Sequence, residues 1–291
     1  MTQAPELRSR ADALSANLPP LLAAAHRLAA TITLGDHGRR RAGMGDEFWQ
    51  YRTAANGDDA RAIDWRRSAR SDTAFVQEKE WQIAHSVMLW VDTAASMGFA
   101  SSDNLPTKMD RAQTLGLATA ILLLRAGERV GLPGLQLAPK RGLPQADAIA
   151  MSLLQNADTD YGAPVDRGLL PHSRAVYLSD FLGDLDGVRR SLDHAAQNNV
   201  HGVMIQVLDP QERDFPFQGR TVFNSLGGSL TFETQRAQSL ASDYSERLVS
   251  RQAELHALAD AAGWQFTIHH TDQSAQSALL WMYSALKAAL V

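Results

Sequence analysis

Three apolar runs in the sequence each end in an aspartate, and they constrain the fold more than any other feature does. The runs are HSVMLWVD, RAVYLSD and VHGVMIQVLD, and they end at Asp92, Asp180 and Asp209. Because apolar side chains follow one another almost without polar alternation, each run is typical of a strand buried on both faces of a parallel sheet. Such strands need helices on both sides, so the runs predict an α/β protein.

Segments with helical periodicity separate these strands, and the alternation predicts a doubly wound, mostly parallel sheet. The predicted helices cover residues 107–127 and 144–155, a stretch after Asp180 that ends near residue 198, and residues 234–262 and 274–289. The Gly227-Gly228 turn in RTVFNSLGGSLTFET predicts a late β-hairpin. We assign residues 1–35 to an N-terminal helical extension broken by Pro19-Pro20, and residues 36–291 to one α/β domain.

Composition excludes several classes of function without identifying one. The chain has 291 residues, a net charge of −4 and no cysteine. The lack of cysteine excludes disulfides, thiolate metal ligands and cysteine nucleophiles, and the negative charge gives no overall field for nucleic acid. The sequence does not open on a signal-peptide pattern, and its most apolar helical stretch, LGLATAILLLRAGERVGL, ends among charged residues. We therefore expect a cytoplasmic protein with no membrane insertion and no nucleic-acid partner.

The three aspartates are expected at the carboxyl ends of strands, where open α/β sheets bind their ligands. Acidic side chains at this edge are candidates for metal ligands or for acid–base groups. The alternative is that they cap the helices that follow the strands. The strand pattern alone leaves both interpretations open.

The sequence VDTAASM, which follows the first strand, resembles the metal-ion-dependent adhesion site of von Willebrand factor A-type domains. The family's Asp-x-Ser-x-Ser motif matches Asp92 to Ser96, its loop threonine matches Thr159 in ADTDYGAPVDRGLL, and its later aspartate matches Asp180. Such a site holds Mg²⁺ through carboxylate and hydroxyl oxygens and leaves one position open for a partner's carboxylate. Ala94 replaces the first serine and removes one oxygen ligand. The resemblance therefore implies a weakened site, with little or no Mg²⁺ bound.

A longer set of segments is similar to the bacterial family called domain of unknown function fifty-eight. These segments are GMGDEFWQYRTAANGDDARAIDWRRSAR, KMDRAQTLGLATAILLLRAGERVGL, YLSDFLGD and VLDPQERDFPFQGRTVF, and the family signature covers residues 39–82. The resemblance implies a von Willebrand factor A-like fold and a role beside a MoxR-type AAA+ ATPase in the maturation or activation of client proteins. The sequence identifies neither the client nor a docking motif for the ATPase. No nucleotide cofactor is expected, because the chain has no phosphate-binding loop of the Gly-x₄-Gly-Lys-[Ser/Thr] type.

The stretch GDDARAIDWRRSARSD, residues 57–72, is the densest run of charge in the chain. Its acids lead and its arginines trail, which complements the dipole of a short helix, and Trp65 offers a large anchor. The pattern favours a buried, charge-paired brace beside the sheet that extends into a docking surface at Arg66, Arg67 and Arg70. A nucleic-acid interface would use the same arginines together with residues 39–41, but no aromatic stacking platform accompanies them.

These observations favour a non-enzymatic interaction module that works through a degenerate adhesion site. The alternative is a metal-dependent hydrolase in which Asp92 and Asp180 hold a metal that activates water. The sequence offers no evident general base for it and no Gly-x-Ser-x-Gly elbow of a serine hydrolase. Phe215 and Phe217, in the loop DPQERDFPFQG, are candidates either for partner anchors or for cover of the core.

Overall fold

The computed structural model describes residues 18–32, 42–54, 63–69, 74–80, 86–133, 137–155, 157–165, 168–228 and 231–288. Contacts within the chain divide it into two compact units. Residues 34–84 form the smaller unit, and residues 1–33 and 85–291 form the larger one. The segment 39–82, which carries the family signature, falls within the smaller unit.

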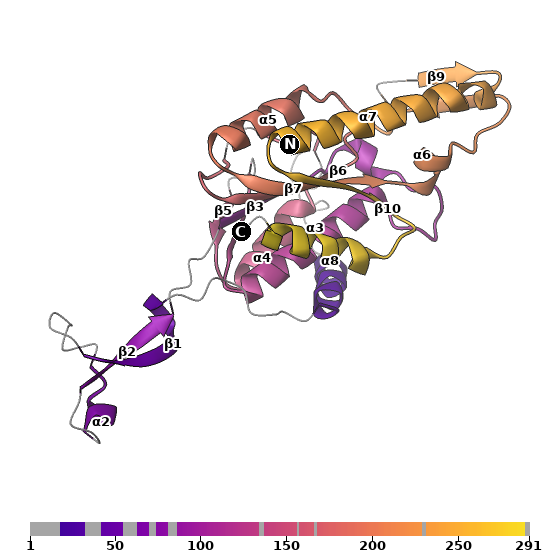
Figure 1. Ribbon diagram of the computed structural model, residues 1–291. Helices are drawn as coiled ribbons and strands as arrows, with labels where there is room; N and C mark the ends of the chain where they lie inside the picture. Colours follow the sequence, from indigo (N-terminus) through magenta and orange to yellow (C-terminus); the bar gives the residue numbers. More distant parts are fainter. Residues whose placement is uncertain are drawn as a thin grey trace, which may run out of the picture. The chain divides into compact units, whose positions relative to one another are not determined.

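Six strands form the central sheet of the larger unit, in the order β10-β7-β6-β3-β4-β5 (Figure 1). The strands are β3 (Ser86–Val91), β4 (Arg129–Leu132), β5 (Leu137–Lys140), β6 (Arg174–Ser179), β7 (His201–Leu208) and β10 (Gln265–His270). All neighbouring strands pair in parallel except β5, which pairs antiparallel with β4 at one edge. The three apolar runs form β3, β6 and β7, which are interior strands with buried side chains on both faces. The predicted doubly wound, mostly parallel fold is confirmed.

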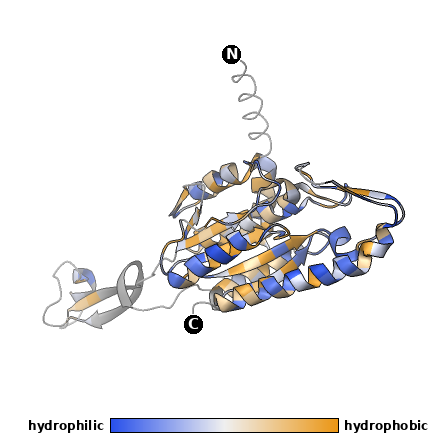
Figure 2. Ribbon diagram, turned by 90° about the horizontal axis from the view of Figure 1, so that it is seen from above, coloured by the Kyte–Doolittle hydropathy of each residue, from blue (hydrophilic) through white to orange (hydrophobic). Residues whose placement is uncertain are grey.

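Helices cover both faces of this sheet. On one face lie α3 (Lys108–Arg125), α4 (Pro144–Leu153) and α8 (Ala275–Ala288), and on the other lie α5 (Asp186–Gln197) and α7 (Ala241–Ala261). Gly116 allows helix α3 to lie very close to the sheet. A Cβ atom at this position would be only 2.7 Å from Val91 Cγ2. Figure 2 shows the hydrophobic strands between helices that carry many hydrophilic residues.

Aromatic rings fill the core between the sheet and the helices α5 and α7. The ring of Tyr177 lies 4.8 Å from that of Trp264 and 5.5 Å from that of Trp90. The hydroxyl groups of Tyr177 and Ser191 are hydrogen-bonded at 2.6 Å. Because its one polar atom has a partner, this tyrosine can be fully buried in an apolar core.

A helix over residues 18–30 packs with the larger unit. Its His26 Nδ1 lies 3.2 Å from an Arg125 nitrogen at the end of α3. Pro19 and Pro20 lie in its first turn, where a missing N–H breaks no helical hydrogen bond. The prolines therefore begin this helix, and the prediction that they break a helix is wrong.

The late hairpin is also confirmed. It consists of β8 (Thr221–Asn224) and β9 (Thr231–Thr234), which pair antiparallel, and Gly228 in its turn has a φ of +76°. The short helix α6 (Pro210–Asp214) precedes the hairpin, and a single 3₁₀ turn, η3 (Ala237–Leu240), leads from it into α7.

The smaller unit is built on two antiparallel strands, β1 (Ala42–Thr53) and β2 (Phe75–Glu80). A one-turn helix, α2 (Trp65–Ser68), is attached to β2 through hydrogen bonds at both of its ends. The N–H of Asp64 donates to the carbonyl of Phe75 at 2.9 Å, and the N–H of Phe75 donates to Ser68 Oγ at 2.8 Å. Main-chain groups and one serine therefore hold this turn in place.

Candidate functional site

The carboxyl ends of β3 and β6 lie side by side, at the point where the chain connections diverge. From β3 the chain passes through α3 toward β4, and from β6 it passes through α5 on the opposite face toward β7. A switch point of this kind is where open α/β sheets bind ligands. Asp92 directly follows β3 and Asp180 directly follows β6, so the structure brings these two predicted residues to one place.

Asp92 is buried, and neutral donors hold its carboxylate. Its Oδ1 accepts the N–H of Ala94 at 2.9 Å, and its Oδ2 accepts the hydroxyl of Ser179 at 2.7 Å. Gly162 lies so close to the carboxylate that any side chain at that position would overlap it. Burial raises the pKa of Asp92, although these hydrogen bonds act to lower it. The carboxylate thus organises the turn that follows β3.

Asp180 has a different partner, the ammonium group of Lys108 at the start of α3. Lys108 Nζ lies 2.8 Å from Asp180 Oδ2 and 2.6 Å from Glu212 Oε1, and the side chains of Lys108 and Asp180 are each only 1% exposed. The other oxygen of Asp180 accepts the N–H of Leu182 at 3.1 Å. Burial acts to lower the pKa of Lys108, but the two carboxylates outweigh burial and raise it. We call Lys108, Asp180 and Glu212 the lysine cluster.

Glu212 belongs at the same time to the cap of α6. Its second oxygen accepts the N–H of Asp209 at 2.8 Å, while Asp209 accepts the N–H of Gln211 at 2.8 Å and that of Ser101 at 3.0 Å. Burial raises the pKa of Glu212 above its ordinary value, although Lys108 and the N–H of Asp209 act to lower it. Of the three strand-end acids, Asp209 therefore follows the capping interpretation.

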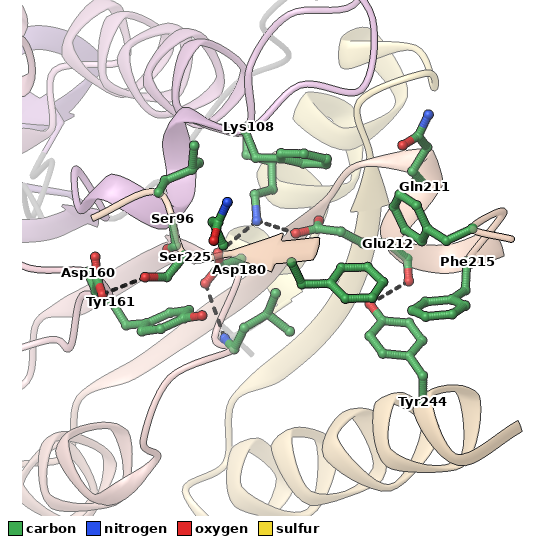
Figure 3. A pocket seen from close by; sticks show the side chains of 16 residues that line it. Ser96, Lys108, Asp160, Tyr161, Asp180, Gln211, Glu212, Phe215, Ser225 and Tyr244 are labelled. Carbon is green, nitrogen blue, oxygen red and sulfur yellow. Dashed lines mark hydrogen bonds and ion pairs between the residues drawn. The ribbon is translucent and has the colours of Figure 1, made fainter. Parts of the chain in front are cut away.

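A cavity of about 220 Å³ opens beside the lysine cluster, and we call it the switch-point cavity (Figure 3). Its polar lining residues are Ser96, Lys108, Asp160, Asp180, Gln211, Glu212, Asn224 and Ser225. Its aromatic lining residues are Phe99, Tyr161, Phe215, Phe217, Phe223 and Tyr244. The cavity thus joins a charged surface to an aromatic wall.

The aromatic wall is formed by rings in mutual contact. The ring of Phe215 lies 4.7 Å from that of Tyr244 and 5.8 Å from that of Phe223, and the rings of Phe217 and Phe223 are 5.1 Å apart. Tyr244 also donates its hydroxyl to the carbonyl of Glu212 at 2.7 Å, which connects the wall to the lysine cluster. Phe215 and Phe217, which the sequence left open between partner anchor and core cover, therefore line a cavity.

The loop at residues 159–162 and the hairpin complete the cavity. The N–H groups of Ala95 and Ser96 donate to the carbonyls of Thr159 and Asp160 at 2.9 and 2.8 Å, so the loop lies along the turn after β3. On the hairpin side, Ser225 Oγ donates to Asp160 Oδ2 at 3.1 Å. Asp160 is thus held between these two segments.

The four predicted metal ligands have different places in this arrangement. Asp180 and Ser96 line the cavity, and Ser96 Oγ is buried without a hydrogen-bond partner among the residues that the structure describes. Asp92 is not among the described residues that line the cavity, and its carboxylate lies against Gly162. Thr159 is exposed, and the residues after it in the loop, Asp160 and Tyr161, line the cavity in its place.

Lys108 and Glu212 were not among the site residues predicted from the sequence. Lys108 is 72 residues from Asp180 and 104 residues from Glu212, so no local pattern could connect them. The only sequence signal was the pattern DPQE, in which Asp209 and Glu212 have the spacing of a capping box.

The predicted docking arginines can be described only in part. Arg66 is exposed, while Arg70 and the side chain of Arg67 lie outside the described residues. Trp65, which we expected to be an anchor, is 63% exposed, so this part of the prediction is wrong. The turn is held by main-chain groups and Ser68, so it does not need the indole ring as an anchor.

Within the described part of the chain, no helix combines the length and the apolar character needed to cross a membrane. The same residues contain no group of three or more His, Asp or Glu side chains arranged to hold a metal ion.

Comparison with known proteins identifies a family and several relatives. The family described as "Protein of unknown function DUF58" matches residues 50–254. An uncharacterized protein of Mycobacterium bovis and one of Mycobacterium tuberculosis are each 26% identical to this chain over 266 residues, which covers 81% of this chain and 80% of the relative.

Comparison with solved structures also finds two proteins that are similar to part of this chain. One is an aerotolerance-related membrane protein from Bacteroides fragilis, with a TM-score of 0.40 and 14% identity over 70% of this chain and 100% of the other. The second is the conserved hypothetical protein BatB from Bacteroides thetaiotaomicron, with a TM-score of 0.38 and 13% identity over 69% of this chain and 98% of the other.

Proposed function

This chain belongs to the DUF58 family, and we propose that it works as a non-enzymatic interaction module whose switch-point cavity receives part of a partner protein. The observation that carries the proposal is the cavity itself, with an aromatic wall on one side and the lysine cluster on the other. Sites for small molecules usually have volumes of roughly 300–1,000 Å³. A cavity of about 220 Å³ is small for a nucleotide and suits a single side chain.

The state of the two strand-end carboxylates favours this function over a metal-dependent hydrolase. A hydrolase needs carboxylates that are free to bind a metal or to take a proton from water. Here both oxygens of Asp92 accept hydrogen bonds from neutral donors, and both oxygens of Asp180 accept hydrogen bonds as well. These carboxylates are engaged in holding the protein together.

The same contacts make the site a poor fit for Mg²⁺. A divalent cation at Asp180 would meet the ammonium group of Lys108, which lies 2.8 Å from the carboxylate. We propose that Lys108 supplies the positive charge that a metal ion supplies in an adhesion site of the von Willebrand factor A type. The strand order, with one antiparallel edge strand and Asp92 and Asp180 at the switch point, supports the relation to that fold.

The proposed partners are a MoxR-type AAA+ ATPase and a client protein, and the proposed location is the cytoplasm. Support for the ATPase comes from the family resemblance carried by residues 39–82 and by the later segments. In this proposal the chain contributes recognition, and the ATPase contributes nucleotide hydrolysis.

A matched pair of leucine variants tests whether the cavity is the interface. Leu226 lines the cavity and is 55% exposed, and Leu280 on α8 is 52% exposed and does not line it. An arginine at position 226 would place a long side chain and a positive charge at the cavity, so we expect Leu226→Arg to abolish capture of the MoxR-type ATPase of the same organism in a pull-down with ATP. Leu280→Arg is expected to leave capture unchanged.

Circular dichroism and thermal unfolding of both variants establish that each is folded before the pull-down is interpreted. If Leu226→Arg captures the ATPase as well as Leu280→Arg does, the interface lies outside the cavity and the proposal is wrong. In that case the exposed Trp65 and Arg66 of the smaller unit are the next positions to change.

A further inference from the structure

We infer that the switch-point cavity recognises a basic side chain of the partner protein, with arginine as the preferred residue. This inference rests on the proposed function and adds the chemistry of the group that enters. It reverses the preference of a metal-containing adhesion site, in which the open metal position accepts a carboxylate.

The charges that line the cavity give the first argument. Asp160, Asp180 and Glu212 contribute three carboxyl groups, and Lys108 contributes one ammonium group. Three negative charges against one positive charge leave an excess of two negative charges when all four groups are ionised. Among the described residues that line the cavity, Lys108 is the only cation. An incoming cation is therefore favoured, and an incoming carboxylate is opposed.

The aromatic wall gives the second argument. A guanidinium group is planar and weakly hydrated, so it stacks on aromatic faces more readily than an ammonium group does. Phe215 and Tyr244 stack on each other at the side of the cavity, with an angle of 30° between their planes, so a guanidinium group can meet only the ring faces that they do not turn to each other. The cavity already contains one cation beside an aromatic face, since Lys108 Nζ lies 5.9 Å from the centre of the Phe99 ring.

Polar acceptors give the third argument. Ser96 Oγ is buried at the cavity without a hydrogen-bond partner among the described residues, and a buried hydroxyl without a partner is costly. A guanidinium group has five N–H donors and no acceptor, so it could satisfy Ser96 and a carboxylate together. A carboxylate ligand offers no donor to the oxygens of Asp160 or Glu212.

The test compares capped amino acids as probes of the full chain. We would titrate Nα-acetylarginine amide, Nα-acetylglutamine amide and Nα-acetylglutamate amide and follow the aromatic NMR signals of the protein. We expect the arginine probe to bind with a dissociation constant in the millimolar range, and at least about tenfold more tightly than the glutamate or the glutamine probe. Equal or tighter binding of the glutamate probe would overturn the inference, as would the absence of arginine binding up to about 10 mM.

Two aspartate variants connect the bound probe to the cavity. Asp160→Asn removes one lining charge and keeps an oxygen that can accept from Ser225, so it is expected to weaken arginine binding about tenfold. Asp193→Asn removes an exposed charge from α5, which does not line the cavity, and is expected to change nothing. Equal effects of the two variants would contradict the placement of the probe in the cavity.

The pull-down separates failure of this inference from failure of the proposed function. If the arginine probe does not bind but Leu226→Arg still abolishes capture of the ATPase, the interaction module stands and only the charge preference is wrong. If the probe binds and also displaces the captured partner, the inference is supported. Binding that leaves capture unchanged would overturn the assignment to a partner's side chain and would indicate a small basic molecule as the ligand.

Discussion

Asp92 and Asp180 end neighbouring strands of one sheet, yet their surroundings are opposite in character. Asp92 is enclosed by neutral donors and by the close approach of Gly162. Asp180 is paired with a buried ammonium group and lines a cavity. Both strands end in aspartate, yet the Asp92 carboxylate has a structural role and the Asp180 carboxylate belongs to a cluster of charged side chains.

The difference arises from which segment crosses each strand end. The loop at residues 159–162 lies over Asp92 and excludes other groups from it. The first turn of α3 brings Lys108 to Asp180, and the cap of α6 brings Glu212 to Lys108. The chemistry of each carboxylate is therefore decided by residues distant in sequence, which the strand motif does not contain.

Replacement of Lys108 should produce the largest loss of stability, because it removes the cation that pairs with Asp180. In Lys108→Met, the buried Asp180 and the part-buried Glu212 keep their positions without a cation. Removing one partner of a buried ion pair costs about 3–5 kcal/mol. We expect a loss of that size in the free energy of unfolding, measured with urea near pH 7, and a partial recovery at lower pH as the Glu212 carboxyl group, whose pKa burial raises, takes up a proton.

A triple variant is the control for this prediction. Lys108→Met combined with Asp180→Asn and Glu212→Gln removes the uncompensated charges while it keeps the approximate volumes. We expect most of the lost stability to return, because the penalty comes from buried charge. If the triple variant is as unstable as the single one, the lysine acts through packing, and the electrostatic description of this side is wrong.

Replacement of Gly162 is the corresponding change on the Asp92 side. In Gly162→Ala the added methyl group would overlap the Asp92 carboxylate, so the loop or the aspartate has to move. Overpacking of this kind typically costs about 1–3 kcal/mol, which is smaller than the effect expected at Lys108. Gly98→Ala is the matched control, because a methyl group there meets no atom within 4 Å. Similar unfolding midpoints for the two alanine variants would show that the loop does not enclose Asp92 tightly.

The fold could be predicted from the sequence because its signals are local. Apolar runs gave β3, β6 and β7, and the Gly227-Gly228 pair gave the hairpin. Since the carboxyl ends of parallel strands meet at one edge, the positions of Asp92 and Asp180 followed as well. Pro19-Pro20 were misjudged because a proline pair is compatible both with a break in a helix and with its first turn.

The site could be predicted only where it follows directly from the strands. Thr159 was predicted, whereas its neighbours Asp160 and Tyr161 line the cavity. Lys108 looks in the sequence like an ordinary solvated residue in the first turn of a helix, and only tertiary packing buries it against Asp180. The aromatic wall likewise combines the loop after α6, the hairpin and α7, which no single stretch of sequence shows together.

The smallest expected effect concerns the ionisation of Asp92 and the pH dependence of stability that follows from it. Burial raises the pKa of Asp92 above its ordinary value of 3.8, so the folded protein takes up this proton at a higher pH than the unfolded chain does. The contribution of Asp92 to stability therefore increases as the pH falls through the folded-state pKa, and it is lost as the pH rises through it. Asp92→Asn cannot titrate, so this contribution is absent from the variant.

We therefore expect the difference in unfolding free energy between the parent protein and Asp92→Asn to shift in favour of the parent as the pH is lowered from about 7 to about 4. Urea unfolding at both pH values measures the shift, and Asp193→Asn, which lies on the exposed side of α5, should show none. A shift of the opposite sign would mean that Asp92 is stabilised as a carboxylate in the folded protein. The two sides of the switch point would then be electrostatically alike, and Asp92 would have to be added to the charges that an incoming ligand meets.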